Sequence, residues 1–207
     1  APSAGRAGSR SQRPGLAARQ IAVSLIDGVL GRGLTFDAAV NAAPGSGLEP
    51  RDRAFAHLLA LSVLRRLGTI DAAIDRHLTS PLPRDAGPTR AILRAAAAQI
   101  LLLETPAHAA IDLAVDQCRL DRRSGRFARL ANAVLRRLSE RHAAGLDADA
   151  PVTGDIPSWL LQRWEAAYGL ERSRLIAAAS LEPAALDITA GHDERLWAER
   201  LGGVLLE

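Results

Sequence analysis

The stretch ILRAAAAQILLLETPAHAAIDLAVD, residues 92–116, decides the fold. Ala and Leu dominate its first part and are good helix formers, so we expect a mostly apolar helix over residues 89–103. Thr105 and Pro106 then indicate the start of a second helix, because Thr can cap a helix that carries Pro at its first position. Two such helices in succession are typical of an all-helical bundle.

The residues around this stretch extend the bundle. We expect helices over residues 16–30, 36–43, 51–67, 70–78, 89–103, 107–118 and 125–141. Their boundary signals are Thr35 as a cap, Pro50 in a first turn, Gly68 as an end and Thr69 as the next cap. The helix over 51–67 is apolar nearly all round, which predicts a place inside the bundle.

After residue 141 the pattern changes. Residues 142–155 are expected to be an acidic linker, and IPSWLLQRWEAAYG (156–169) begins an amphipathic helix. Its Trp159, Trp164 and Tyr168 are expected to pack between the bundle and the linker, with base stacking as the alternative.

The last residues suggest a strand, a helix and a strand. Leu186, Ile188 and Thr189 indicate the first strand, residues 193–201 a helix, and residues 204–206 the second strand. A two-stranded sheet is marginal alone, so we expect the segment 156–207 to be the start of a partial α+β unit of a longer protein.

Charge divides the chain at the same place. Residues 1–141 carry 21 Arg against 12 acidic residues, a net charge of +9, whereas residues 142–207 carry 5 Arg against 11, a net charge of −6. This difference predicts two modules and makes the first a candidate for binding a polyanion. The Gly-, Ser-, Pro- and Arg-rich residues 1–15 are expected to be a disordered basic arm ahead of a helical domain over 16–141.

Composition excludes several classes of protein. Cys118 is the only cysteine among 207 residues, which excludes an intrachain disulfide and a zinc site built on several cysteines. The five His show no metal-binding spacing, so no metal site is expected. No stretch approaches the ~20 apolar residues of a membrane span, and the N-terminus lacks a signal peptide's apolar core. These features fit a protein of the cytoplasm.

Arginine carries the sharpest chemical signal, since the chain has 26 Arg and no Lys. At ~100° per residue, one helical stripe holds Arg122, Arg126, Arg129, Arg136, Arg137 and Arg141. Guanidinium groups bind phosphate bidentately, and a disordered basic arm can fold onto RNA. The alternative is a solvated Arg face. The candidate RNA-binding residues are Arg6, Arg10, Arg13, Arg19, Arg122, Arg126, Arg129, Arg136 and Arg137.

Other polar residues in the helices have structural explanations. We expect Arg94 to pair with an acidic residue or to extend its head group to water. Gln99 and Asn132 are expected to make buried hydrogen bonds rather than to contact RNA. Arg65 and Arg66 suit the negative C-terminal end of their helix.

Four segments in chain order resemble one family. They are DRAFAHLLALSVLRRLGTID (52–71), ILRAAAAQILLLETPAHAAIDLAVD (92–116), RLANAVLRRL (129–138) and IPSWLLQRWEAAYG (156–169). The first three resemble the helical domain of the transcription antitermination factor NusB. All four together resemble the N-terminal part of the RsmB (Sun/Fmu) family of bacterial 16S ribosomal RNA (cytosine-C5)-methyltransferases, over roughly residues 15–206.

The resemblance implies a NusB-like domain that binds 16S ribosomal RNA, with S-adenosylmethionine bound by a later catalytic domain. That family uses two catalytic cysteines. Cys118 matches neither motif and no glycine-rich loop follows a strand, so no catalytic or cofactor-binding residue is assigned and the chain is expected to be inactive alone. The alternatives are a free-standing NusB-like antitermination factor and a protein–protein interaction bundle. The oligomeric state is left open.

Overall fold

The computed structural model describes residues 13–43, 47–145, 152–182 and 186–205. Its helices are α1 (Leu16–Leu30), α2 (Phe36–Ala42), α3 (Pro50–Arg65), α4 (Leu67–Asp75), α5 (Thr89–Leu101), α6 (Ala107–Leu120), α7 (Ala128–Ala143), α8 (Ser158–Leu181) and α9 (Glu194–Leu201), with short 3₁₀ helices η1 (Gly125–Phe127) and η2 (Val152–Asp155). The predicted mainly α fold is confirmed.

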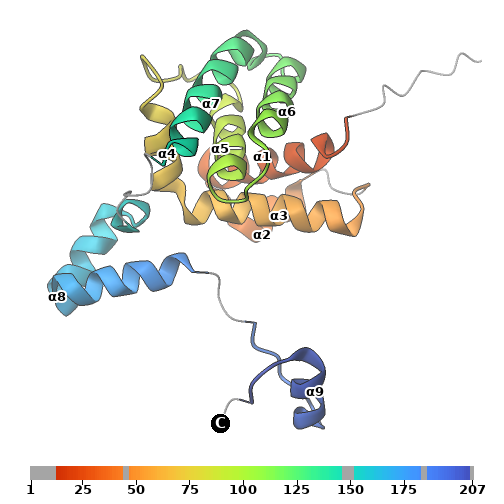
Figure 1. Cartoon of the computed structure of the whole chain (residues 1–207), viewed down its shortest axis with the longest axis vertical. Coiled ribbons are helices and arrows are strands. Elements are labelled where there is room, and N and C mark those ends of the chain that lie inside the picture. Colours follow the sequence, from red (N-terminus) through yellow and green to blue (C-terminus); the bar gives the residue numbers. More distant parts are fainter. Residues whose placement is uncertain (1–12, 44–46, 146–151, 183–185, 206–207) are drawn as a thin grey trace, which may run out of the picture.

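Helix α5 lies at the centre of the bundle. Helices α1, α3, α4, α6 and α7 all contact it (Figure 1). The four alanines over residues 95–98 are each at most 1% exposed, and such small side chains let the surrounding helices approach closely. Larger side chains such as Leu93, Leu59 and Leu135 fill the remaining core and are fully buried.

Two of the predicted boundary signals are confirmed. The hydroxyl of Thr35 accepts a hydrogen bond from the Ala38 amide (3.2 Å) and caps α2. Pro50 is the first residue of α3, where its missing N–H is not needed. Both signals depend only on neighbouring residues.

The prediction for Gly68 and Thr69 is wrong. Helix α3 ends at Arg65 and α4 begins at Leu67, so Gly68 lies in the first turn of α4 and Thr69 is inside the helix rather than its cap. The reason is tertiary, because Thr69 donates hydrogen bonds to a carboxylate 86 residues further along the chain.

Two other helix starts are shifted. Pro106, not Thr105, occupies the N-cap position of α6, since the Thr105 amide donates to the Gln99 carbonyl (3.0 Å) and closes the preceding turn. Helix α7 begins at Ala128 instead of residue 125. Arg122 and Arg126 therefore precede α7, and the predicted single helical stripe is wrong for these two residues.

Helix α3 is also less enclosed than its sequence suggests. Leu58 is 52% exposed and Leu61 is 38% exposed, whereas Leu59 and Val63 are fully buried. The helix packs mainly against α1 and α5. The exposure of Leu58 and Leu61 corrects its expected place inside the bundle to a place at the bundle surface.

Beyond the bundle, α8 is bent at Gly169, whose φ of 77° is a left-handed conformation that glycine adopts without strain. The predicted helix near residues 193–201 is present as α9, but neither predicted strand forms in the described residues. Leu186 and Val204 are 85% and 87% exposed. A strand needs a partner for its backbone groups, and none is supplied in this part of the chain.

Candidate nucleic-acid interface

The turn between α6 and α7 presents a cluster of arginines, which we call the basic turn (residues 121–127). The Asp121 carboxylate accepts hydrogen bonds from the amides of Arg123 (3.0 Å) and Ser124 (2.8 Å). The hydroxyl of Ser124 is buried and donates to the Ala86 carbonyl (3.2 Å). These contacts fix the backbone, so the exposed side chains of Arg122 and Arg123 extend from a defined scaffold.

Arg126 is held beside this turn by two contacts. Its Nη2 lies 2.5 Å from Asp85 Oδ2, and its guanidinium lies 4.8 Å from the Phe127 ring centroid. The hydrogen bond from Arg126 lowers the pKa of the Asp85 carboxyl. Both side chains are more than half exposed, so water and salt screen this pair and phosphate can compete for Arg126.

The basic turn encloses a shallow cavity. Its volume is about 390 Å³, and it is lined by Arg122, Arg123, Arg126 and Asp85. Three guanidinium groups around one carboxylate leave a net positive charge, which suits an anion such as phosphate.

Helix α7 continues the positive surface. Arg129, Arg136 and Arg137 are exposed, whereas Val134 and Leu138 on the other side of the helix are buried. This division follows from the 3.6-residue period. Structure and sequence pattern therefore agree for these three candidate residues.

A second cavity, of about 340 Å³, lies between α6 and α7. Its polar lining residues are Arg13, Asp112, Asp116, Arg119, Arg129 and Asn132. Arg13 pairs with Asp116 (2.9 Å), and Arg119 lies 3.7 Å from the same carboxylate. Asn132 is only half-buried and faces this cavity, which corrects its expected buried role.

Arg19 has a structural role. Its Nε donates to the buried Gln99 Oε1 (2.6 Å), its Nη1 donates to the Gly15 carbonyl (3.0 Å), and its guanidinium lies 4.9 Å from the Phe55 ring centroid. Burial lowers the pKa of Arg19, and the charge of Asp52 opposes this shift. We leave Arg19 out of the proposed interface. Arg6 and Arg10 lie outside the described residues.

The structural role of Arg19 predicts a loss of stability when its side chain is removed. We expect Arg19→Ala to lower the free energy of unfolding by roughly 1–2 kcal/mol, because it removes a hydrogen bond to buried Gln99 and a cation–π contact. Urea unfolding followed by circular dichroism measures this loss. Arg13→Ala is the control, since Arg13 is exposed and its ion pair contributes little. Equal stabilities for the two variants would contradict the structural role.

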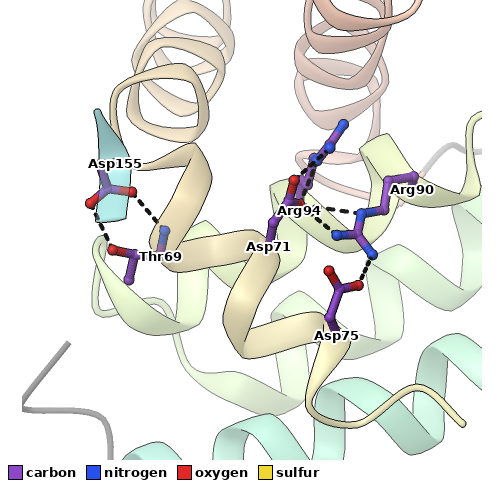
Figure 2. A network of polar contacts seen from close by, with 6 residues as sticks. All are labelled: Thr69, Asp71, Asp75, Arg90, Arg94 and Asp155. Carbon is purple, nitrogen blue, oxygen red and sulfur yellow. Dashed lines mark hydrogen bonds and ion pairs between the residues drawn. The ribbon is translucent and has the colours of Figure 1, made fainter. Parts of the chain in front are cut away.

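Other arginines are already neutralised by carboxylates. Arg94 donates two hydrogen bonds to Asp71 (2.8 and 2.7 Å), and Arg90 bridges Asp71 and Asp75 (Figure 2). The expected pairing of Arg94 is confirmed. This network ties α5 to α4 and removes its cations from the candidate interface.

Two candidate residues were missed from the sequence. Arg119 and Arg123 lie in the same arginine run as the predicted residues but fall outside its calculated stripe. Arg123 lines the cavity of the basic turn together with Arg122, and Arg119 lines the cavity between α6 and α7 together with Arg129. For Arg123, this placement follows from the turn after α6, which the sequence pattern did not reveal. Trp159 and Tyr168, by contrast, are 64% and 54% exposed and do not pack closely as expected.

Cys118 has no features of a nucleophile. It is fully buried in α6, and burial together with the charge of Asp121 raises the pKa of its thiol to about 11. With this pKa, only about one thiol in a thousand is ionised at pH 8. The thiolate is the reactive form, so Cys118 reacts slowly in the folded protein. We expect iodoacetamide to leave the folded protein unmodified, by mass spectrometry, while it fully modifies a urea-unfolded sample. Equal rates would contradict this burial.

The described ranges contain no group of three or more His, Cys, Asp or Glu that could hold a metal ion. No helix within them is long and apolar enough to span a membrane.

The helical bundle and the exposed arginines of the basic turn and α7 define this chain as a helical domain with a positively charged surface. The profile of the NusB family matches residues 16–140, which is more than half of the chain. The chain therefore belongs to the NusB family.

Curated relatives extend the similarity past the bundle. The ribosomal RNA small subunit methyltransferase B of Xylella fastidiosa (strain Temecula1) is 32% identical over 196 residues, 93% of this chain and 44% of the relative. The proteins of the same name from Xanthomonas campestris and Thermus thermophilus are 37% and 38% identical, over 75% and 68% of this chain. The chain spans 34% and 32% of the lengths of these two relatives.

Proposed function

We propose that this chain is the RNA-binding part of an S-adenosylmethionine-dependent 16S ribosomal RNA (cytosine-C5)-methyltransferase of the cytoplasm. Its role is to hold ribosomal RNA in position for methyl transfer at a separate catalytic part. The similarity to methyltransferase B proteins along most of the chain supports the enzyme class. The observation that carries RNA binding is the exposed arginine set of the basic turn and α7.

The physical argument rests on phosphate. Each guanidinium that neutralises a phosphate releases a condensed counterion, so the arginines supply affinity that depends strongly on salt. The shape of the RNA and its unpaired bases would supply specificity. A rigid turn is suited to this task because its backbone is held by Asp121 and Ser124 before RNA binds.

The described residues do not fit a site for S-adenosylmethionine. They contain no strand followed by a glycine-rich loop and a helix, the arrangement that commonly holds the cofactor's nucleoside. Buried Cys118 is not a nucleophile either. We therefore assign methyl transfer to none of the described residues.

The experiment is a salt titration of binding to a 16S ribosomal RNA fragment and to an equally long non-ribosomal RNA. We expect tighter binding to the 16S fragment, with log Kd changing by about 2–4 per tenfold change in salt, as for 3–5 phosphate contacts. Equal affinity for both RNAs would contradict the 16S assignment, because it would show attraction to phosphate without selection of an RNA. No binding at low salt would contradict RNA binding and favour a protein-interaction bundle.

A further inference from the structure

The carboxylate of Asp155 is fully buried against the N-terminal end of α4. Its Oδ1 accepts the Thr69 amide (2.6 Å), and its Oδ2 accepts the Thr69 hydroxyl (2.7 Å) and Arg66 Nε (2.8 Å). Figure 2 shows the carboxylate arriving from a separate chain segment to face Thr69. Three donors from the bundle thus converge on one residue that follows the bundle in sequence.

Helix α4 needs such a partner. It begins at Leu67 directly after α3 ends at Arg65, and no side chain caps it at the N-cap residue Arg66. The first amides of a helix lack acceptors within the helix and carry a partial positive charge. Asp155 supplies the missing acceptor and a compensating negative charge from 86 residues away.

The backbone at this point is adapted to close contact. A Cβ atom added to Gly68 would lie 1.8 Å from the Gly154 carbonyl oxygen and 2.7 Å from its carbon. Backbone meets backbone here, so a side chain at residue 68 would force residues 154–155 away from α4. Glycine at this position is therefore explained by docking rather than by helix termination.

We propose that the N-terminal end of α4 is a docking site for η2, and that Asp155 is the positioning residue that sets how α8 is held on the bundle. Helix α8 begins at Ser158, three residues after Asp155. Helix α8 packs against η2, and no comparable packing of α8 on a bundle helix is present in the described residues. Its side chains Trp159, Tyr168 and Leu175 are exposed. A few directed hydrogen bonds and one close backbone contact define the direction in which α8 leaves the bundle (Figure 1).

The substitution Asp155→Asn tests this proposal. It keeps the shape of the side chain, but it removes the negative charge and turns an amide NH₂ toward Arg66 or Thr69, which are donors themselves. Gly68→Ala reaches the same end by a different route, since the new methyl group displaces Gly154. The matched control is Asp187→Asn, which removes an exposed carboxylate beyond α8.

Two measurements are made on each variant. Nitroxide labels on cysteines introduced at Ala54 in α3 and Glu171 in α8 report the distance between bundle and helix by electron paramagnetic resonance. Hydrogen exchange reports the Thr69 amide. We expect one narrow distance distribution in the unsubstituted chain, a broad one in Asp155→Asn and Gly68→Ala, and at least about tenfold faster exchange at Thr69 in Asp155→Asn.

The outcomes separate docking from general stability. Unchanged hydrogen exchange in the amides of α5 shows that the bundle is intact. If exchange in α5 also becomes faster, the milder Thr69→Val, which removes a single donor, is tested by the same two measurements. A narrow distribution in both docking variants, or broadening in Asp187→Asn, would overturn the proposal. None of these substitutions changes a candidate RNA contact. We therefore expect the salt dependence of RNA binding to be unaltered, and either proposal can fail while the other holds.

Discussion

Replacing Arg129, Arg136 and Arg137 by Ala should weaken binding to the 16S ribosomal RNA fragment about a hundredfold at 0.1 M salt. Each lost contact with single-stranded RNA removes about 0.7 from the slope of log K against log salt, so three contacts reduce it by about 2. A slope difference of 2 corresponds to two decades in affinity at 0.1 M salt. The three side chains are exposed on α7, so folding should be little affected.

The control removes the same charge elsewhere. Arg163, Arg172 and Arg174 are exposed on α8, and their triple Ala variant has the same net charge as the α7 variant. We expect its salt slope to remain that of the unsubstituted chain, because net charge alone does not make phosphate contacts. Equal loss in both triple variants would show a diffuse electrostatic attraction and would sink the assignment of α7 as the RNA-binding face.

The largest expected effect on stability comes from Leu93→Ala in α5. Leu93 is fully buried on α5, the helix that α1, α3, α4, α6 and α7 contact. Truncation removes its apolar contacts and leaves a cavity that packed neighbours cannot fill, so the free energy of unfolding should fall by about 2–5 kcal/mol. Urea unfolding followed by circular dichroism at 222 nm measures the difference.

Leu175→Ala provides the comparison for that substitution. Leu175 has the same chemistry but is 66% exposed on α8, so we expect a change of less than about 0.5 kcal/mol. A small effect at Leu93 would mean that the core around α5 is loosely packed, contrary to the burial of its four alanines.

The local signals of this sequence were sufficient for most of the bundle. Periodicity located α1, α5 and α7 to within a few residues because each helix carries its own apolar face. Thr35 and Pro50 act on their immediate neighbours and were interpreted correctly. Gly68 and Thr69 were misinterpreted because their true partner, Asp155, is distant in sequence and no periodic pattern reveals it.

The candidate interface shows the same division. The sequence showed where arginine gathers, and Arg129, Arg136 and Arg137 lie on the exposed face that the helical period predicts. It did not distinguish Arg19, which packs on Phe55 and Gln99, from arginines free to meet solvent. It also missed Arg123, because the chain leaves helical geometry between α6 and α7.

By itself, the sequence determined the helical class, the positive character of residues 1–141 and the family resemblance, because these depend on composition, on local periodicity and on motifs. Only the tertiary structure decided which arginines are exposed, which ones donate hydrogen bonds to Asp71 or Gln99, and where Asp155 docks. Such assignments depend on distances between residues far apart in the chain, and those distances exist only after the helices pack around α5.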